Sequence, residues 1–250
     1  MDSIKNLPIG VFDSGIGGLN VLYKLSKTFK NENFIYFGDN SNAPYGSKTK
    51  TELYNLCANA VDRLVNAGVK AVVIACNTAS TNCLNKLKKE RPNLPIIGTF
   101  PCLINNERTL LFSTPKTANS AFVKNNFTLT KVVPLKTLAK DIENFYINGT
   151  PINLEQIKRR KNFNAQSVVL GCTHYIYLKK EFKSIFKCTI CDGLNEVCAR
   201  LKSQIKGLES TVKGQSIYFI GDSAEFNFFV YKSAFGVKNG CQVVKIPKKI

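Results

Sequence analysis

Ala71-Val-Val-Ile-Ala75 runs directly into Cys76-Asn-Thr78, and Ser167-Val-Val-Leu-Gly171 runs directly into Cys172-Thr-His174. In both places a β-prone apolar run ends in a cysteine beside a threonine, and a helical pattern follows. We therefore predict two buried strands, each followed by a helix. Because ligands of open α/β sheets bind beyond the carboxyl ends of the strands, each cysteine stands where a reactive group is expected.

The two cysteines predict a site with two acid/base groups. Thiols on separate strands can face one substrate from opposite sides, which suits removal of a proton from one face of a carbon and its return to the other. His174 is the only histidine in the chain and lies two residues after Cys172. The alternative is structural, since free cysteine is often buried and inert. The polar residues after each cysteine favour the functional interpretation.

Length and composition indicate a globular protein. The chain has 250 residues, 44% of them hydrophobic, enough for one large domain or two smaller ones with their own cores. The segment from Met1 to Pro8 lacks the apolar region of a secretory signal, and no apolar run reaches the roughly 18 residues that span a bilayer. We expect a soluble, cytoplasmic protein with no membrane partner.

The cysteine pattern predicts neither a disulfide framework nor a metal site. The chain has nine cysteines, an odd number, without an export signal. Cys188-Thr-Ile-Cys191 is a CxxC motif, but a tetrahedral zinc site needs two further ligands, and a second CxxC does not occur. We therefore predict no metal.

The formal charge of +18 comes from 35 Lys and Arg against 17 Asp and Glu. Such an excess can indicate nucleic-acid binding, but the basic residues are dispersed and no helix-turn-helix, zinc-finger or RRM signature is present. We favour general solvated basicity over a nucleic-acid site. The charge also suits an acidic small molecule as ligand.

Short apolar runs alternate with amphipathic stretches along the chain, which predicts parallel sheets with helical crossovers. Two such series predict two similar α/β lobes with a cleft between them, a preferred place for small-molecule sites. The predicted strands are Ile9–Phe12, Phe34–Phe37, Ala71–Ala75, Ile96–Ile97, Leu110–Phe112, Lys131–Val133, Val168–Leu170 and Ser216–Ile220.

Asp13-Ser-Gly-Ile-Gly-Gly18 forms a glycine-rich turn between a predicted strand and a predicted helix. A dinucleotide fingerprint requires G-x-G-x-x-G, but here the third glycine position is Asn20. We interpret Asp13, at the end of the strand, as either a helix cap or a carboxylate that orients a thiol or an amine. The glycines would let the backbone approach a ligand closely.

Two further motifs lie in loops. Pro44-Tyr45-Gly46 is either a simple turn or a backbone clamp over a carboxylate. Thr114-Pro-Lys-Thr117 places hydroxyl groups after a strand, at a predicted helix start. Hydroxyl and amide groups at several helix starts favour a substrate with two carboxylates.

The motifs together resemble those of the glutamate racemase family, within the aspartate/glutamate racemase superfamily. They occur in the family's order and span most of the chain. The stretches that carry the resemblance are Asp13-Ser-Gly-Ile-Gly-Gly18, Pro44-Tyr-Gly46, Ala75-Cys-Asn-Thr-Ala-Ser80, Thr114-Pro-Lys-Thr117, Leu170-Gly-Cys-Thr-His-Tyr175 and Gly221-Asp222.

The resemblance implies two flavodoxin-like lobes: residues 1–97 with 209–250, on the Asp13 and Cys76 side, and residues 98–208, on the Cys172 and His174 side. It implies interconversion of L- and D-glutamate without PLP or another cofactor, which supplies D-glutamate for peptidoglycan synthesis, and hence cell-wall biogenesis and cell shape. A homodimer is a possible assembly.

The resemblance also assigns roles to residues. Cys76 would act on the D-enantiomer with help from Asp13, and Cys172 on the L-enantiomer with help from His174. The residues expected to bind substrate are Asp13, Ser14, Pro44, Tyr45, Gly46, Cys76, Asn77, Thr78, Thr114, Thr117, Cys172, Thr173 and His174.

The chain departs from the family pattern at four places. Lys136-Thr137 follows Pro134-Leu135 where the family has a glutamate soon after, so no carboxylate appears before Asp141. Gly98-Thr-Phe-Pro101 lacks a frequent acidic residue, Ile176 replaces a proline, and Asn42 replaces an arginine.

Two alternative functions stay open at this level. One is a racemase of aspartate or another acidic amino acid, since related enzymes share the two-cysteine plan. The other is a basic, racemase-like binding protein with reduced activity, for instance one that binds a nucleic-acid enzyme such as gyrase.

Overall fold

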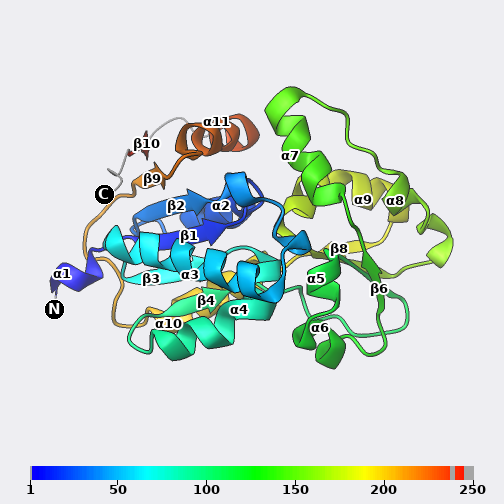
Figure 1. Ribbon diagram of the computed structural model, residues 1–250, viewed down its shortest axis with the longest axis horizontal. Helices are drawn as coiled ribbons and strands as arrows, with labels where there is room; N and C mark the ends of the chain where they lie inside the picture. Colours follow the sequence, from blue (N-terminus) through cyan, green and yellow to red (C-terminus); the bar gives the residue numbers. More distant parts are fainter. Residues whose placement is uncertain (1, 237–239, 245–250) are drawn as a thin grey trace.

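The computed structural model describes residues 2–236 and 240–244, which form two lobes (Figure 1). All the paired strands run parallel. The first sheet has the order β10-β9-β2-β1-β3-β4 and the second the order β6-β5-β7-β8. The predicted α/β class with two parallel sheets is thus confirmed.

The strands of the first sheet are β1 (Ile9–Asp13), β2 (Phe34–Gly38), β3 (Ala71–Ile74), β4 (Ile96–Gly98), β9 (Ile217–Ile220) and β10 (Cys241–Val243). Its helices are α1 (Asp2–Lys5), α2 (Gly18–Thr28), α3 (Lys50–Asn66), α4 (Asn77–Glu90) and α11 (Ala224–Phe235), with 3₁₀ turns η1 (Asn40–Asn42) and η2 (Tyr45–Ser47).

The second sheet consists of β5 (Thr109–Ser113), β6 (Lys131–Pro134), β7 (Ser167–Gly171) and β8 (Thr189–Cys191). The helices and turns of this part are α5 (Pro115–Ala118), α6 (Ala121–Asn126), α7 (Leu138–Asn148), α8 (Glu155–Lys158), η3 (Lys161–Phe163), η4 (Thr173–Leu178), α9 (Lys179–Phe186) and α10 (Leu194–Gln204).

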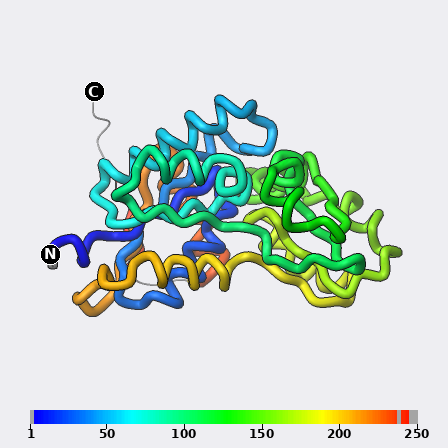
Figure 2. Tube along the Cα trace, turned by 90° about the horizontal axis from the view of Figure 1, so that it is seen from below, coloured from blue at the N-terminus to red at the C-terminus, as the bar shows by residue number. Residues whose placement is uncertain are grey.

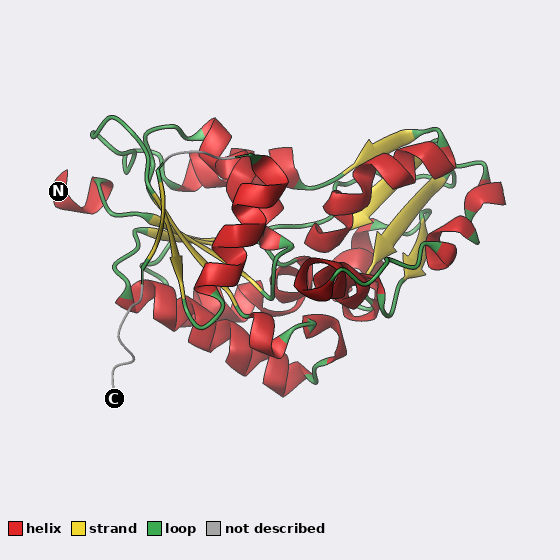
Figure 3. Cartoon of the chain, turned by 90° about the horizontal axis from the view of Figure 1, so that it is seen from above, coloured by secondary structure: helices red, strands yellow, loops and turns green. Residues whose placement is uncertain are grey.

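Helices cover both faces of the six-stranded sheet (Figure 3). Val11 of β1 packs in one apolar cluster with Leu22 of α2, whereas its neighbour Phe12 packs in another with Leu53 of α3. Successive residues of a strand point to opposite faces, so a strand covered on both sides reads as a continuous apolar run. This explains why the uninterrupted runs in the sequence predicted buried parallel strands.

The chain passes between the lobes twice, from β4 to β5 and from β8 to α10 (Figure 2). After the second passage, α10 packs against α2 and β4 of the first sheet. The lobe bounds derived from the resemblance, with residues 98–208 in the second lobe, stay a prediction. The contacts of α10 favour a second lobe that ends before Leu194.

Several predicted helices begin elsewhere than expected. The helix predicted over Leu135–Asn148 begins at Leu138, and the one predicted over Tyr175–Phe186 is the 3₁₀ turn η4 followed by α9. The sequence prediction missed β8, β10 and α10. The two strands have only three residues each, whereas α10 carries a detectable apolar face at Leu194, Val197 and Leu201. Among the described residues, no helix is long and apolar enough to cross a bilayer.

Candidate active site

The carboxyl ends of strands from both sheets meet at the junction of the lobes. Asp13 ends β1, Cys76 follows β3 as the N-cap residue of α4, and Cys172 follows β7. Contacts cross the junction directly, since Thr173 Oγ1 donates to Asp13 Oδ2 at 3.2 Å. Thr173 also accepts at its carbonyl oxygen from Asn20 Nδ2 of α2, at 3.2 Å. The structure therefore brings the two predicted halves of the site together.

On the second-lobe side, Cys172, His174 and Glu143 form a row. Cys172 Sγ lies 3.9 Å from His174 Nδ1, and His174 Nε2 lies 2.6 Å from Glu143 Oε1. All three side chains are buried. Burial by itself lowers the pKa of His174, but its hydrogen bonds to Cys172 and Glu143 prevail and hold the pKa well above the ordinary value of 6.5. The imidazole therefore favours its charged form between two acidic partners.

Glu143 is the site residue that the sequence analysis missed. The first carboxylate after Pro134-Leu135 is Asp141, but the one on the buried face of α7 is Glu143, two residues further on. Buried positions of this helix include Leu138, Ala139 and Ile142, so the face was visible in the apolar spacing. A glutamate on the buried face of a predicted helix is the signal that could have found it.

On the first-lobe side, Ser14 lies between Asp13 and Cys76. Ser14 Oγ is 3.7 Å from Cys76 Sγ and donates to Asp13 Oδ1 at 3.5 Å. Asp13 Oδ1 also accepts from the amide of Gly15 at 3.0 Å. The carboxylate is thus linked to the thiol through one hydroxyl.

Burial dominates the electrostatics of this side. It raises the pKa of Asp13 from 3.8 to about 6, against the opposing effect of the His174 charge. Burial, together with the nearby Asp13 charge, also raises the pKa of Cys76 above its usual range. The amide of Ala79, in the first turn of α4, acts in the opposite direction because it hydrogen-bonds to the sulfur. Cys76 therefore favours the neutral thiol.

The glycine-rich loop allows the second lobe to approach the backbone of the first. A Cβ atom on Gly15 would lie 1.9 Å from Glu143 Oε1, and one on Gly17 would lie 2.5 Å from His174 Nδ1. The amide of Ile16 donates to Glu143 Oε1 at 2.8 Å. The glycines thus make room for side chains of the other lobe, and the close approach to a ligand stays a prediction.

Three threonines form a hydroxyl cluster across the junction. Thr78 Oγ1 of α4 lies 2.9 Å from Thr114 Oγ1 and 3.1 Å from Thr117 Oγ1. Thr114 caps α5 by accepting from the amide of Thr117 at 3.2 Å. A Cβ atom on Gly46 would lie 3.1 Å from the Cβ of Thr114, so the Pro44–Gly46 loop borders this cluster. Hydroxyls at two helix starts are well suited to bind a carboxylate.

The side chains of two predicted site residues, Tyr45 and Asn77, are hydrogen-bonded to other protein groups. Tyr45 Oη donates to Asp39 Oδ2 at 2.6 Å, and Asn77 Nδ2 donates to the carbonyl oxygen of Thr99 at 3.2 Å. Both side chains are buried. Any contact of these two residues with a ligand would therefore come more readily from their backbone than from their side chains.

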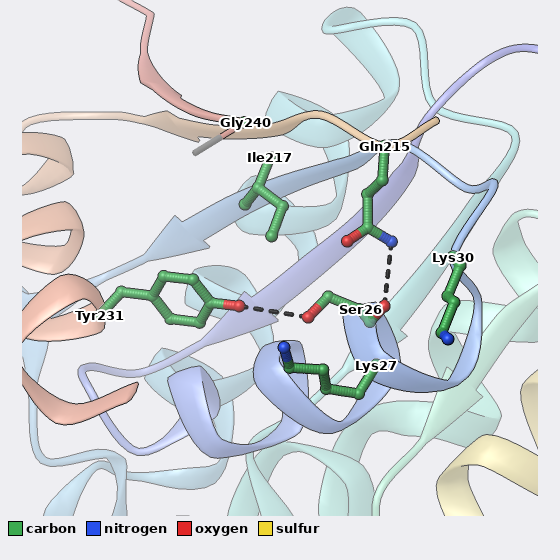
Figure 4. A pocket seen from close by; sticks show the side chains of 7 residues that line it. All are labelled: Ser26, Lys27, Lys30, Gln215, Ile217, Tyr231 and Gly240. Carbon is green, nitrogen blue, oxygen red and sulfur yellow. Dashed lines mark hydrogen bonds between the residues drawn. The ribbon is translucent and has the colours of Figure 1, made fainter. Parts of the chain in front are cut away.

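A cavity of about 290 Å³ lies where β9 and β10 begin, and neither Cys76 nor Cys172 lines it (Figure 4). Figure 4 shows Tyr231 Oη directed at Ser26 and the Gln215 amide directed at the backbone of the same residue. The cavity is lined by Ser26, Lys27, Lys30, Gln215, Ile217, Tyr231 and Gly240, a set distinct from the predicted site residues.

The described residues contain no group of three or more His, Cys, Asp or Glu side chains arranged to hold a metal ion. Cys188 and Cys191 of the CxxC motif belong to no such group: Cys188 precedes β8, Cys191 ends it, and both thiols are free.

Two parallel sheets, with one cysteine after β3 of the first and one after β7 of the second, define a two-lobed α/β class of protein. No protein-family model matches the chain. A glutamate racemase of Clostridium novyi is 35% identical over an alignment that covers 99% of this chain and 98% of the relative. The chain belongs to the glutamate racemase family.

Solved structures agree with this assignment. Glutamate racemase isoform RacE1 from Bacillus anthracis superposes with a TM-score of 0.82 at 25% identity and covers 98% of this chain and 100% of its own. Glutamate racemase from Francisella tularensis, solved in complex with D-glutamate, superposes with a TM-score of 0.77 at 25% identity, with 96% and 98% covered.

Proposed function

We propose that this protein interconverts L- and D-glutamate without a cofactor, by a two-base transfer of the Cα proton. The observation that carries the proposal is the pair of buried thiols, one from each lobe, each with its own polar partners. Relatives over nearly the full length of the chain are glutamate racemases, and one of them was crystallised with D-glutamate.

On the second-lobe side, Cys172 takes the Cα proton of L-glutamate. His174 is held in its charged form by Glu143, so it can stabilise the thiolate of Cys172 through Nδ1. Glu143 does not reach the sulfur and acts by positioning the imidazole. The row thus supplies a base in a site from which bulk water is excluded.

On the first-lobe side, Cys76 delivers a proton to the opposite face of the carbon. Its thiol form is favoured in the unliganded site, as a proton donor requires. In the reverse direction Cys76 must first lose its proton, and Asp13 can accept it through Ser14.

The hydroxyl cluster of Thr78, Thr114 and Thr117 binds one carboxylate of the substrate in this proposal. The groups around the Cα atom of the substrate are bound by Ser14, by Thr173 and by the backbone at Asn77, where α4 begins. The loop of Pro44, Tyr45 and Gly46 closes the site over Thr114.

The cellular role proposed is the supply of D-glutamate for peptidoglycan synthesis, in the cytoplasm. The lobes would correspond to the bounds given by the resemblance, adjusted at α10, and a homodimer remains a proposed assembly. Glutamate rather than aspartate is favoured because relatives that match over most of the chain, from Clostridium novyi and Clostridium perfringens, are glutamate racemases.

The test is to incubate the purified protein with L-glutamate in D₂O, without added PLP or metal, and to follow the loss of optical rotation. We expect racemisation to D-glutamate that carries deuterium at Cα, since the second base holds a solvent-derived proton. Product that retains the substrate hydrogen would exclude the two-base scheme. Failure to racemise, together with salt-resistant binding to duplex DNA, would favour the alternative of a basic binding protein.

A further inference from the structure

A row of polar side chains joins the C-terminal helix α11 to the histidine of the site. Asn227 of α11 is fully buried, and its Nδ2 donates to Asn40 Oδ1 at 2.9 Å. Asn40 Nδ2 in turn donates to Glu143 Oε2 at 3.4 Å, and the other oxygen of Glu143 holds His174. The row begins on the first lobe and ends on the second, which Figure 1 shows as separate bodies carrying α11 and α7.

The charge of Glu143 fixes the direction of every bond in the row. A carboxylate can only accept, so Asn40 must turn its amide N–H toward Glu143 and its carbonyl oxygen away. That oxygen can then accept from the amide of Asn227. Among the described residues, Asn227 Oδ1 has no hydrogen-bond partner. The bond from Nδ2 to Asn40 therefore supplies the hydrogen bonding of this buried amide group.

The backbone beside the row leaves space for it. A Cβ atom on Gly38, at the end of β2, would lie 2.6 Å from Asn227 Nδ2 and 2.9 Å from Asn40 Oδ1. Any side chain at this position would displace the two amides. The glycine is therefore matched to the pair.

We infer that Asn40 and Asn227 are positioning residues for the Cys172 side of the reaction. Asn40 holds the second oxygen of Glu143, so the first oxygen stays on His174 Nε2 and Nδ1 stays directed at Cys172. Asn227 holds Asn40 in that orientation. This inference rests on the proposed function, and it makes a helix of the first lobe part of the acid/base group of the second.

The test separates the two sides of the reaction with the two Cα enantiomers of 3-chloroglutamate. A thiolate removes the Cα proton, the electron pair forms a Cα–Cβ double bond, and chloride leaves. The enamine product hydrolyses to 2-oxoglutarate and ammonia, which are measured. Each elimination needs one deprotonation only, so the L-enantiomer reports on Cys172 and the D-enantiomer on Cys76.

Asn40→Leu should slow elimination from the L-enantiomer about tenfold, the lower end for a hydrogen bond to a charged group, and leave the D-enantiomer within about twofold. Asn227→Leu should have the same selectivity with a smaller effect. The matched control is Asn126→Leu, because the amide of Asn126 donates only to the carbonyl oxygen of Phe122 in its own helix. It should change neither rate.

Asn40→Asp gives a second readout and keeps the size of the side chain. Its carboxylate would face Glu143, so the L-side rate relative to the unsubstituted protein should fall at high pH and recover as the new carboxyl group is protonated. Equal slowing of both enantiomers, or no slowing, would overturn the inference while the wild-type racemisation stands. A wild-type protein that neither racemises glutamate nor eliminates chloride would overturn the proposed function, and the inference with it.

Discussion

His174 Nε2 lies 2.6 Å from Glu143 Oε1, although 31 residues separate the two in the chain. The same carboxylate oxygen accepts from the amide of Ile16 in the first lobe. Glu143 thus orients the only histidine of the chain and contacts the other lobe with one group. The first prediction concerns this pair.

Glu143→Gln should lower the pKa of His174, because a neutral amide stabilises the imidazolium less than a carboxylate does. We expect the imidazole to titrate at a lower pH than in the wild type, and kcat/KM to fall about 100-fold. Since the chain has a single histidine, ¹⁵N NMR of the imidazole reports its titration without assignment, provided that any affinity tag is removed. Glu155→Gln, at an exposed salt bridge with Lys158, serves as control. An unchanged His174 titration would contradict the role given to Glu143.

Asp13 should make stability depend on pH in a specific direction. Its pKa is about 6 when folded and 3.8 ordinarily, so the folded state binds more protons between these values and loses stability as the pH rises through them. Asp13→Asn removes this loss. The free energy of unfolding of the variant should therefore gain about 2 kcal/mol on the wild type between pH 4 and pH 7, measured by urea denaturation. A constant difference across this range would show that Asp13 is not the titrating group.

Gly17→Ala tests the close contact between the lobes. The backbone at Gly17 has φ of −56°, which alanine adopts without strain, so any effect comes from the added methyl group. That methyl would lie 2.5 Å from both His174 Nδ1 and Thr173 Oγ1. We expect about 1–3 kcal/mol of destabilisation and a loss of activity far larger than the loss of folded protein. Full activity in the folded variant would mean that the site does not need this contact.

Thr114→Val should weaken glutamate binding with little effect on the proton transfers. It removes one hydroxyl of the cluster with Thr78 and Thr117, and we expect KM to rise about tenfold. Thr114→Ser restores the hydroxyl and should restore KM. Thr81→Val is the matched control, because among the described residues Thr81 Oγ1 donates to backbone carbonyls of α4 and accepts from Asn82 Nδ2, all within its own helix. Steady-state kinetics with L-glutamate would contradict the assignment if KM were unchanged in Thr114→Val.

Most of the strands, though not β8 and β10, could be predicted from the sequence because buried parallel strands are uninterrupted apolar runs. Ala71–Ile74 and Ser167–Gly171 illustrate this, since every residue in both strands is buried. Once these strands are placed in parallel sheets, the residues that follow their carboxyl ends are expected at one edge, where the lobes meet. This is why Asp13 and Thr173, far apart in the sequence, were expected on one site and lie in contact.

The missed features depend on contacts between elements that are far apart in the sequence. Apolar spacing places Glu143 on the buried face of α7, but its contact with His174 appears only in the folded structure. Asn40 and Asn227 look like ordinary loop and helix residues, and their link to Glu143 appears only in three dimensions. The bond of the Tyr45 hydroxyl to Asp39 is another contact that a turn motif cannot reveal.

Cys172 is assigned to the L-enantiomer and Cys76 to the D-enantiomer. The most direct test of this assignment uses the two cysteine-to-serine variants with the enantiomers of 3-chloroglutamate. Serine is nearly isosteric with cysteine but far less acidic, so each variant should fold and lose one base. We predict that Cys76→Ser eliminates chloride from the L-enantiomer only and Cys172→Ser from the D-enantiomer only, while neither racemises glutamate. Racemisation at the wild-type rate by either variant, or elimination from the same enantiomer by both, would contradict the two-base account.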